Sequence, residues 1–289
     1  MEIRDNGPAI GAMLVANAAF LLNDTLVKFS SDNLPLGQMI FVRGAICIVL
    51  LAIVCQVTGV FRSARLLIHP MVLLRTLAEV CATLLYLTAL MRMPIANATS
   101  ILQALPLVVT AAAAIFLKAP VGWRRWTAIG VGLTGVMLII RPGFEGFDAW
   151  ALVALAGVMF MAIRDLSTRQ MPEEIPTYGV SLMTAVGVTI MGAGLSVSEG
   201  WQPMVLQDYL SLSGAAGFIL FGYIFIILAM RSGDISVVAP FRYSAVLWAL
   251  AIGFVVWGEV PDAMTIIGTT IIILTGIYSF WRERRLSGG

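Results

Sequence analysis

Charged residues are scarce in this chain of 289 residues, and that shortage excludes most classes of soluble protein. Asp, Glu, Lys and Arg make up 12% of the sequence, against about 25% in an ordinary globular domain. Hydrophobic residues make up 60%, and the mean hydropathy is +0.94. A disordered chain needs the opposite balance. The composition therefore indicates an all-α membrane protein that crosses the bilayer several times.

Histidine and cysteine are also rare. The single histidine, His69, excludes an H-E-x-x-H motif and most metal sites built from several histidines. The three cysteines, Cys47, Cys55 and Cys81, lie in apolar runs, where cysteine acts as a small hydrophobic residue. A net charge of +2 offers no basic surface for nucleic acid. We expect no metal, no cofactor and no nucleic-acid partner.

Long apolar runs predict ten transmembrane helices. Each helix needs about 20 mostly apolar residues, and charge-free stretches bounded by polar residues supply ten such segments. Several of them begin near a proline, which the first turn of a helix tolerates. The predicted spans are 8–29, 36–57, 70–91, 94–117, 123–141, 147–166, 176–197, 208–230, 235–256 and 261–281.

Lys and Arg outside these spans predict the orientation of the chain. If the N-terminus is cytoplasmic, the other side of the membrane holds three basic residues, Lys28, Arg92 and Arg141, and the cytoplasmic side holds twelve. Basic residues concentrate on the cytoplasmic side of membrane proteins, so both termini are predicted to be cytoplasmic. The twelve are Arg4, Arg62, Arg65, Lys118, Arg124, Arg125, Arg164, Arg169, Arg231, Arg282, Arg284 and Arg285.

Two short segments recur about 140 residues apart. Ala89–Arg92 matches Leu228–Arg231 at an offset of 139, and Leu133–Val136 matches Leu274–Ile277 at an offset of 141. The repeat predicts two five-helix halves, residues 1–143 and 144–289. An odd number of helices per half makes the halves inverted, which is typical of transporters with a site near the middle of the membrane.

Motifs near the ends of the halves resemble a known family. They are Lys118–Trp126 and Gly135–Gly143 in the first half and Trp257–Pro261 in the second. The chain resembles the EamA-type transporters of the drug/metabolite transporter superfamily, and among them the bacterial exporters of aromatic and other neutral amino acids. That family usually has an acid in both tight loops. Here Glu259 is present, and Ala119 stands in the first loop.

The resemblance implies a multi-pass protein of the bacterial inner membrane that works by alternating access. It also implies a central cavity lined mainly by spans 1, 3, 4, 6, 8 and 9. The G-x-G-x-x-G sequence from Gly130 to Gly135 lies inside an apolar helix. There it predicts close helix packing, because a dinucleotide site requires a preceding strand.

Charged side chains inside the bilayer cost at least about 2.5–3.5 kcal/mol each, so they are candidates for function. Arg75 and Glu79 are four residues apart on one predicted helix face. Two interpretations are open: the pair neutralises itself, or Glu79 meets a substrate amine or a coupling proton.

Arg242 lies about 11 Å into the ninth span at 1.5 Å per residue, just after Pro240, which breaks the helix hydrogen bonds. Arginine clamps carboxylates with two N–H bonds. The alternative is that Arg242 pairs with Glu79 or a carbonyl. Aromatic residues nearby suit a substrate side chain: Phe241, Tyr243 and Trp248.

Neutral polar residues complete the candidate substrate site. Asn97 and Gln103 of the fourth span are costly to bury, and Tyr86 and Tyr223 are interior tyrosines. Asn17, Asp24 and Arg43 rank lower. Asp24 is predicted to pair with Lys28, four residues along the helix. Arg43 is predicted to pair with Asp24 or to extend toward the membrane surface.

The sequence thus predicts a secondary transporter, not an enzyme, that exports amino acids or related small metabolites. Three alternatives stay open: a carrier for a nucleobase, cofactor-like metabolite or cationic compound; an intramembrane enzyme; and a structural or lipid-handling protein. The expected partners are a small-molecule substrate and the lipid bilayer. Proton coupling, and the choice between a monomer and a weak homodimer, are left open.

Overall fold

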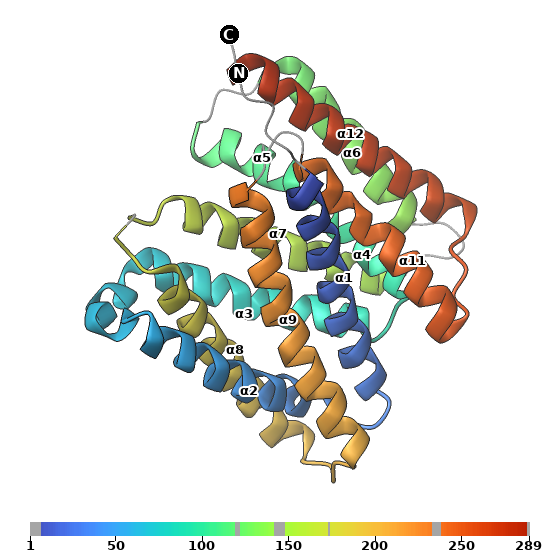
Figure 1. Cartoon of the computed structure of the whole chain (residues 1–289). Coiled ribbons are helices and arrows are strands. Elements are labelled where there is room, and N and C mark those ends of the chain that lie inside the picture. Colours follow the sequence, from blue (N-terminus) through green and yellow to red (C-terminus); the bar gives the residue numbers. More distant parts are fainter. Residues whose placement is uncertain (1–6, 119–121, 142–147, 173, 233–237, 288–289) are drawn as a thin grey trace.

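In the computed structural model, residues 7–118, 122–141, 148–172, 174–232 and 238–287 are described, and every regular element among them is a helix (Figure 1). Arg4, Ala119 and the predicted boundary at 143/144 lie outside these ranges. The elements are α1 (Gly7–Ser30), α2 (Leu36–Val57), η1 (Val60–Ile68), α3 (Pro70–Leu90), α4 (Ile95–Leu102), α5 (Leu105–Phe116), α6 (Trp123–Ile140), α7 (Ala149–Arg169), α8 (Thr177–Glu199), α9 (Leu206–Ser232), η2 (Ala239–Tyr243), α11 (Ser244–Trp257) and α12 (Ala263–Ser287).

Eight segments of the described chain are long and apolar enough to cross a membrane. The remaining two predicted spans are weaker. Helix α6 has 18 residues and begins with Arg124 and Arg125, while the apolar part of α12 is the shorter segment Ala263–Ser279. The eight are Gly7–Ser30, Leu36–Val57, Pro70–Leu90, Ile95–Phe116, Ala149–Arg169, Thr177–Glu199, Leu206–Ile226 and Pro240–Trp257.

The main helix contacts each join one helix from each half of the chain. Helix α1 packs against α9, α3 against α7, α2 against α8, and α6 against α12. In Figure 1 the α6–α12 pair lies at one edge of the molecule and the α2–α8 pair at the opposite edge. The other helices lie between these two pairs. If each of the first five spans is exchanged with the corresponding span of the last five, the first with the sixth and so on, the same set of pairs results.

Glycine allows helices in these pairs to approach closely, as α6 and α12 do. A Cβ atom added to Gly135 of α6 would lie 2.7 Å from the carbonyl oxygen of Gly268 in α12. On the neighbouring turn, a Cβ at Gly132 would meet Leu107 and Thr275. Two glycines of the G-x-G-x-x-G sequence therefore serve helix packing, as predicted, because no larger residue fits between the backbones.

Two spans are interrupted near a proline. The fourth consists of α4 and α5, with the break at Gln103 and Ala104, just before Pro106. The ninth begins as the short 3-10 helix η2, which contains Pro240, and continues as α11. Proline lacks the N–H group that a continuous helix needs, so the breaks fall where the sequence places prolines.

The helices run between two ends of the molecule. Helix α1 begins and α12 ends at the terminal end, whereas α1 ends and α12 begins at the far end (Figure 1). Helix α4, the far-end part of the fourth span, packs against α11, while α5 packs against α7. The fourth and ninth spans thus contact each other at the far end.

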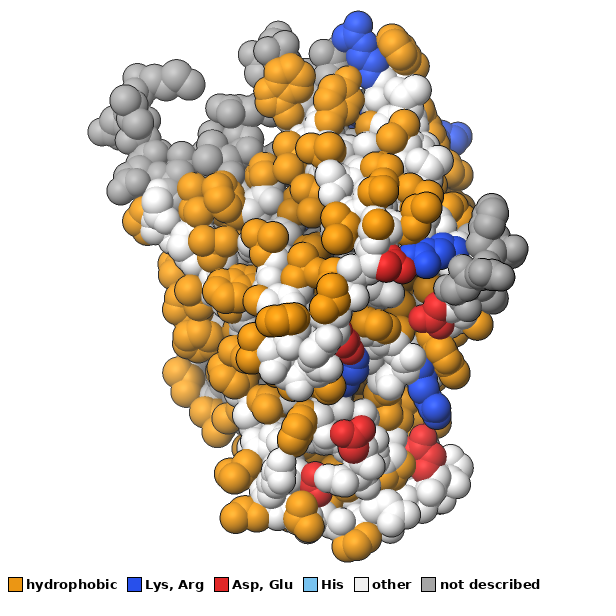
Figure 2. All heavy atoms as spheres, turned by 90° about the vertical axis from the view of Figure 1, so that its right-hand side faces the viewer, with side chains coloured by type: hydrophobic (Ala, Val, Ile, Leu, Met, Phe, Trp, Pro, Cys, Tyr) orange, Lys and Arg blue, Asp and Glu red, His pale blue; other side chains and the backbone are white. Residues whose placement is uncertain are grey.

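The outer surface suits a lipid environment. Hydrophobic side chains cover most of the face drawn in Figure 2, with few charged groups among them. Leu247, Val255 and Ile190 are among the large apolar residues exposed on this molecule. Such an extensive apolar surface is unfavourable in water and expected in a bilayer.

Candidate functional site

The backbone of η2 is held by a side chain from α1. The Nδ2 atom of Asn17 donates to the carbonyl oxygens of Phe241 and Arg242, at 3.0 and 3.2 Å, and approaches the Ser244 hydroxyl oxygen at 2.9 Å. Asn17 is buried, with 6% of its surface exposed. It gives a further donor to carbonyls that share the Ser244 N–H at the end of η2, and such side-chain donors help irregular backbone to be tolerated inside a membrane.

The guanidinium of Arg242 extends from this supported turn without a partner. Arg242 is exposed, and within the described residues its side chain forms no hydrogen bond or ion pair. The charged groups within electrostatic reach are Asp165 and Arg164 of α7. The alternative interpretation, in which Arg242 pairs with Glu79, is therefore not what the structure shows, and the N–H groups of Arg242 are available to an incoming anion.

The aromatic residues around Arg242 divide into two groups. Phe241 and Trp248 are 37% and 40% exposed although they lie within a span. Tyr243 is buried, and its hydroxyl packs directly against Gly276 of α12. Of the three aromatics predicted next to Arg242, two remain accessible, while Tyr243 fixes η2 to α12.

Glu79 is paired across helices and not along its own. Its Oε2 atom accepts a hydrogen bond from Nη1 of Arg164 in α7 at 2.8 Å, and Arg164 also binds its neighbour Asp165 at 2.8 Å. Arg75 instead donates to the hydroxyls of Thr168 and Thr184, at 2.9 and 2.5 Å. The Arg75–Glu79 pair, one of the two interpretations left open by the sequence, is absent, because α7 packs on α3 and supplies a closer cation.

Arg164 is also a correction to the predicted loop charges. Helix α7 continues to Arg169, so Arg164 lies inside the helix, and its side chain is 20% exposed. The sequence placed it among the cytoplasmic basic residues, because a helix ending at residue 166 puts it in the last turn. Arg164 and Asp165 are thus the charged site residues that the sequence analysis missed.

Asp24 lies in a group of neutral donors. Its two carboxylate oxygens accept hydrogen bonds from the Asn23 amide at 2.9 Å and from the Tyr86 hydroxyl at 3.1 Å. Nη1 of Arg43 donates to Asn23 at 3.1 Å. Arg43 is buried and does not extend to the surface; it hydrogen-bonds Asn23 and lies within electrostatic reach of Asp24.

Lys28 binds Glu259 and not Asp24. Its Nζ atom lies 2.9 Å from Oε1 of Glu259 and 2.9 Å from the Met93 carbonyl oxygen, and 4.8 Å from the centre of the Trp257 ring. The second oxygen of Glu259 accepts the N–H of Ile95 at 3.0 Å. The predicted Asp24–Lys28 pair is therefore wrong in this conformation.

The remaining predicted residues lie close to the helix breaks or the charged groups. Gln103 is buried at the break between α4 and α5, and Asn97 is half-buried in α4. Tyr223 of α9 is 45% exposed, packs edge-on against Phe20, and has Glu79 and Arg164 within electrostatic reach. In α4, Ser100 accepts a hydrogen bond from Thr269 of α12 at 2.8 Å, as expected of a residue that joins helices.

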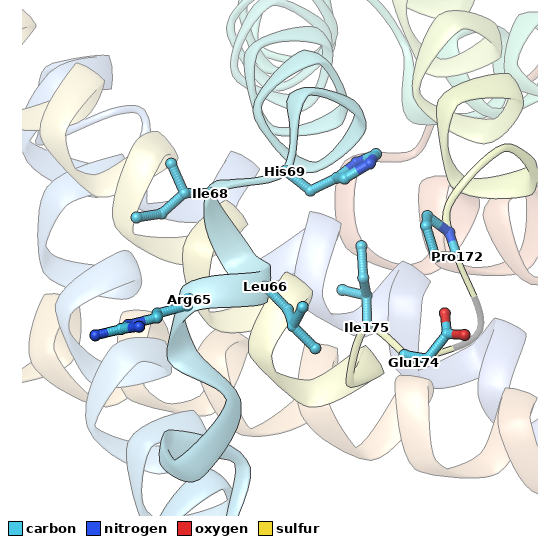
Figure 3. Close-up of a pocket in the computed structure, with 7 residues that line it drawn as sticks. All are labelled: Arg65, Leu66, Ile68, His69, Pro172, Glu174 and Ile175. Carbon is cyan, nitrogen blue, oxygen red and sulfur yellow. The ribbon is translucent and has the colours of Figure 1, made fainter.

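A separate pocket of about 340 Å³ opens at the terminal end, between η1 and the connection from α7 to α8 (Figure 3). There His69 accepts the N–H of Met71 at 3.2 Å and so caps the start of α3. No predicted site residue lines the pocket. Its lining residues are Arg65, Leu66, Ile68, His69, Pro172, Glu174 and Ile175.

The geometry suits the recognition of an anionic group inside the membrane. Arg242, Arg75, Glu79, Arg164 and Asp165 lie on three different elements, and Arg242 alone among them lacks a hydrogen-bonding partner. The described residues contain no cluster of His, Cys, Asp and Glu that is suited to hold a metal ion.

Comparison with known proteins gives matches along nearly the whole chain. The model of the EamA-like transporter family matches residues 7–141 and 148–281. The pseudopaline exporter of Pseudomonas aeruginosa is 27% identical over 270 residues, covering 91% of this chain and 93% of that protein. The riboflavin transporter of Vibrio cholerae is also 27% identical, covering 91% and 89%.

More distant matches agree in fold. The S-adenosylmethionine uptake transporter of Rickettsia conorii is 22% identical over 281 residues, covering 96% of this chain and 93% of that protein. One solved crystal structure superposes with a TM-score of 0.64 at 18% identity, covering 93% of this chain and 96% of that one. At that identity the structural likeness concerns the fold alone.

Proposed function

Because the chain belongs to the EamA-like transporter family, we propose that it exports amino acids or related small carboxylates by alternating access. Membership of this family, within the drug/metabolite transporter superfamily, makes it a membrane transporter of small metabolites and not an enzyme. It is a multi-pass protein of the bacterial inner membrane.

The observation that carries the substrate proposal is the Arg242 guanidinium. It is exposed at the start of the interrupted ninth span, and its side chain lacks a partner in the described structure. Arg242 is the third residue of the apolar segment Pro240–Trp257, and a bound carboxylate would pair its guanidinium through two N–H bonds. Phe241 and Trp248, both partly exposed, are the proposed contacts for the rest of the substrate.

The proposed architecture has ten spans in two inverted halves, residues 1–143 and 144–289. The exchange symmetry of the helix pairs supports it, since each pair maps onto itself or another pair. The surplus of basic residues at the terminal end supports cytoplasmic termini. Reporter fusions that fluoresce only in the cytoplasm test this orientation at both termini.

The direction of transport is proposed from the closed far end. Helices α4 and α11 pack together there, and Lys28 with Glu259 ties α1 to the loop that follows α11. With cytoplasmic termini, this leaves the site to be loaded from the cytoplasm. Export follows if the far end then opens.

Transport into proteoliposomes tests the proposal. A counterflow panel of labelled amino acids, organic acids, nucleobases and cationic compounds, run with and without a pH gradient, gives the substrate class and any proton coupling. We expect Arg242→Ala to abolish carboxylate transport and Arg242→Lys to retain part of it, since lysine keeps the charge but not the bidentate geometry. Arg92→Ala, at an exposed position of the far end, is the matched control.

Normal transport by Arg242→Ala with folded protein contradicts the proposed carboxylate site. A second candidate, a ring-bearing metabolite such as a nucleobase or cofactor, is favoured by the exposed rings of Phe241, Trp248 and Tyr223. Two relatives are named as transporters of riboflavin and of S-adenosylmethionine. A monomer or weak homodimer is proposed, and light scattering in detergent measures which is present.

A further inference from the structure

A cluster of contacts fastens the far end of the molecule, which we name the far-end latch: Lys28, Met93, Ile95 and Glu259. Lys28 bridges the Glu259 carboxylate and the Met93 carbonyl oxygen, at 2.9 Å each. Glu259 in turn accepts the first N–H of α4, from Ile95, at 3.0 Å. The latch therefore joins the end of α1, the start of α4 and the loop after α11.

Asp24 lies one helical turn before Lys28 on α1. Lys28 is bound to Glu259 in the far-end latch, so it does not pair with Asp24. Among the acids well inside the described spans, Glu79 and Asp165 both pair with Arg164, and only Asp24 forms no ion pair. Its oxygens are bound by the neutral Asn23 amide and Tyr86 hydroxyl. Arg43 donates to the Asn23 oxygen and lies within electrostatic reach of Asp24, so it offsets part of the Asp24 charge without forming an ion pair with it.

Asp24 and Glu259 compete for one lysine. Residues four apart on a helix are neighbours, and an acid preceding a lysine by four is the favourable order. Lys28 therefore reaches Asp24 whenever Glu259 moves away, as it must when the far end opens. A lysine side chain with its flexible four-carbon stem suits such an exchange.

We propose that Lys28 exchanges partners during transport, from Glu259 in the closed far end to Asp24 in the open one, and that Asp24 binds the ammonium group of the substrate while Lys28 is held by Glu259. The second part rests on the proposed function, because it requires a substrate with an amine. Asn17 and Asp24 lie on the same face of α1, about 10 Å apart along the axis. The substrate thus lies between Arg242, whose backbone Asn17 holds, and Asp24.

The exchange links opening to release. In the closed state neutral donors bind the Asp24 oxygens and no cation contacts them directly, so the carboxylate is available to an ammonium group from the site. On opening, the Lys28 ammonium takes the place of the substrate ammonium on the same carboxylate. When the site is open to the far side, Asp24 is therefore already paired with Lys28. Release of the substrate there is favoured over rebinding.

A labelling experiment without substrate tests the partner exchange. Met93, a latch residue whose surface is 4% exposed, is replaced by cysteine after the three native cysteines are removed. An impermeant maleimide is then applied from the far side. We expect Glu259→Gln to raise the labelling rate about tenfold, which corresponds to roughly 1.4 kcal/mol. Asp24→Asn should lower the rate, since the open state loses its ion pair, and the exposed Asp32→Asn should leave it unchanged.

A second pair of variants separates exchange from misfolding. In a Lys28→Gln background no lysine is shared, so adding Asp24→Asn should not slow labelling further. An unchanged or raised rate in Asp24→Asn alone, with Lys28 present, overturns the exchange. An equal slowing of labelling by Asp24→Asn with and without Lys28 also overturns the exchange.

Transport of matched compounds tests the ammonium site. Phenylalanine and its deaminated analogue 3-phenylpropionate are compared in proteoliposomes. We expect a preference for phenylalanine of about tenfold or more, falling below about twofold in Asp24→Asn. A preference that survives in Asp24→Asn, or transport only of compounds without amines, overturns the ammonium site. Absence of any transport contradicts the proposed function and the ammonium site, while labelling still decides the exchange.

Discussion

Glu79 of α3 and Arg164 of α7 form an ion pair that joins the two halves of the chain inside the membrane. The distance from Oε2 to Nη1 is 2.8 Å, and the side chains are 17% and 20% exposed. Arg164 also binds Asp165, so one guanidinium serves two carboxylates. Three charges thus sit together where an isolated one would be expensive.

Removing Glu79 should destabilise the protein moderately. Breaking a fully buried pair costs about 3–5 kcal/mol, but Arg164 keeps Asp165, so we expect about 1–2 kcal/mol for Glu79→Gln. Thermal unfolding in detergent measures the loss. In an Arg164→Gln background, Glu79→Gln should cost less than it does alone, since the interaction between the two residues is already absent. Additive losses would show that the two residues do not interact.

Replacing Asn17 should disturb η2. In Asn17→Ala the carbonyl oxygens of Phe241 and Arg242 lose a donor and keep the shared Ser244 N–H, at a cost of about 0.5–1.5 kcal/mol for a lost hydrogen bond. Transport should fall as well, because Arg242 loses its fixed position. Asn17→Asp should behave alike, since a carboxylate cannot donate. The exposed Asn33→Ala serves as control, and equal effects at both positions would contradict this role.

Gly135 and Gly130 of α6 offer a matched pair. A Cβ at Gly135 would lie 2.7 Å from a backbone oxygen of α12, whereas one at Gly130 meets nothing within 4 Å. We expect Gly135→Ala to lower stability by about 1–3 kcal/mol through overpacking. Gly130→Ala should be neutral or stabilising by up to about 1 kcal/mol, since alanine favours helix. Similar melting temperatures for both variants would be evidence against the close contact.

Asp262 gives a pH dependence outside the spans. The backbone N–H of Thr265 and the side chain of Arg141 both bind its carboxylate, and they lower its pKa below the ordinary value. The charged form is therefore favoured by folding, and its contribution is present above the unfolded pKa and lost as pH falls through the folded one.

Asp262→Ala should consequently lower the melting temperature at neutral pH, at a cost of about 1 kcal/mol for a lost helix cap. The difference from the original protein should shrink as the pH falls below about 4. Asp262→Asn keeps a capping side chain and should lose less. A gap that stays constant down to low pH would assign the effect to something other than the carboxylate charge.

Much of the fold was predictable because the bilayer imposes length and hydropathy on each span. Eight of the ten predicted spans meet those criteria within the described chain. Helix α6 does not, because Arg124 and Arg125 fall inside its first turn. The breaks at Pro106 and Pro240 were predictable for the same local reason, a missing N–H group.

The partners of the charged residues were not predictable from spacing along one helix. The pairs expected four residues apart, Arg75 with Glu79 and Asp24 with Lys28, are both replaced by pairs across helices. A same-helix pair is worth only about 0.2–0.5 kcal/mol. Packing between α3 and α7 therefore decides the outcome, and one sequence without its contacts does not contain that information.

The shortness of α6 affects how the protein sits in its membrane. Its 18 residues span about 27 Å, some 3 Å less than the hydrocarbon core of an average bilayer. At the edge formed with α12, either the bilayer must become thinner or the arginine side chains of α6 must extend toward the membrane surface. Either adjustment costs fractions of a kcal/mol per Å of mismatch. Lipids with longer acyl chains therefore increase the hydrophobic mismatch at this edge in particular. The opposite edge, formed by the 22-residue α2 and the 23-residue α8, has helices long enough to avoid that mismatch.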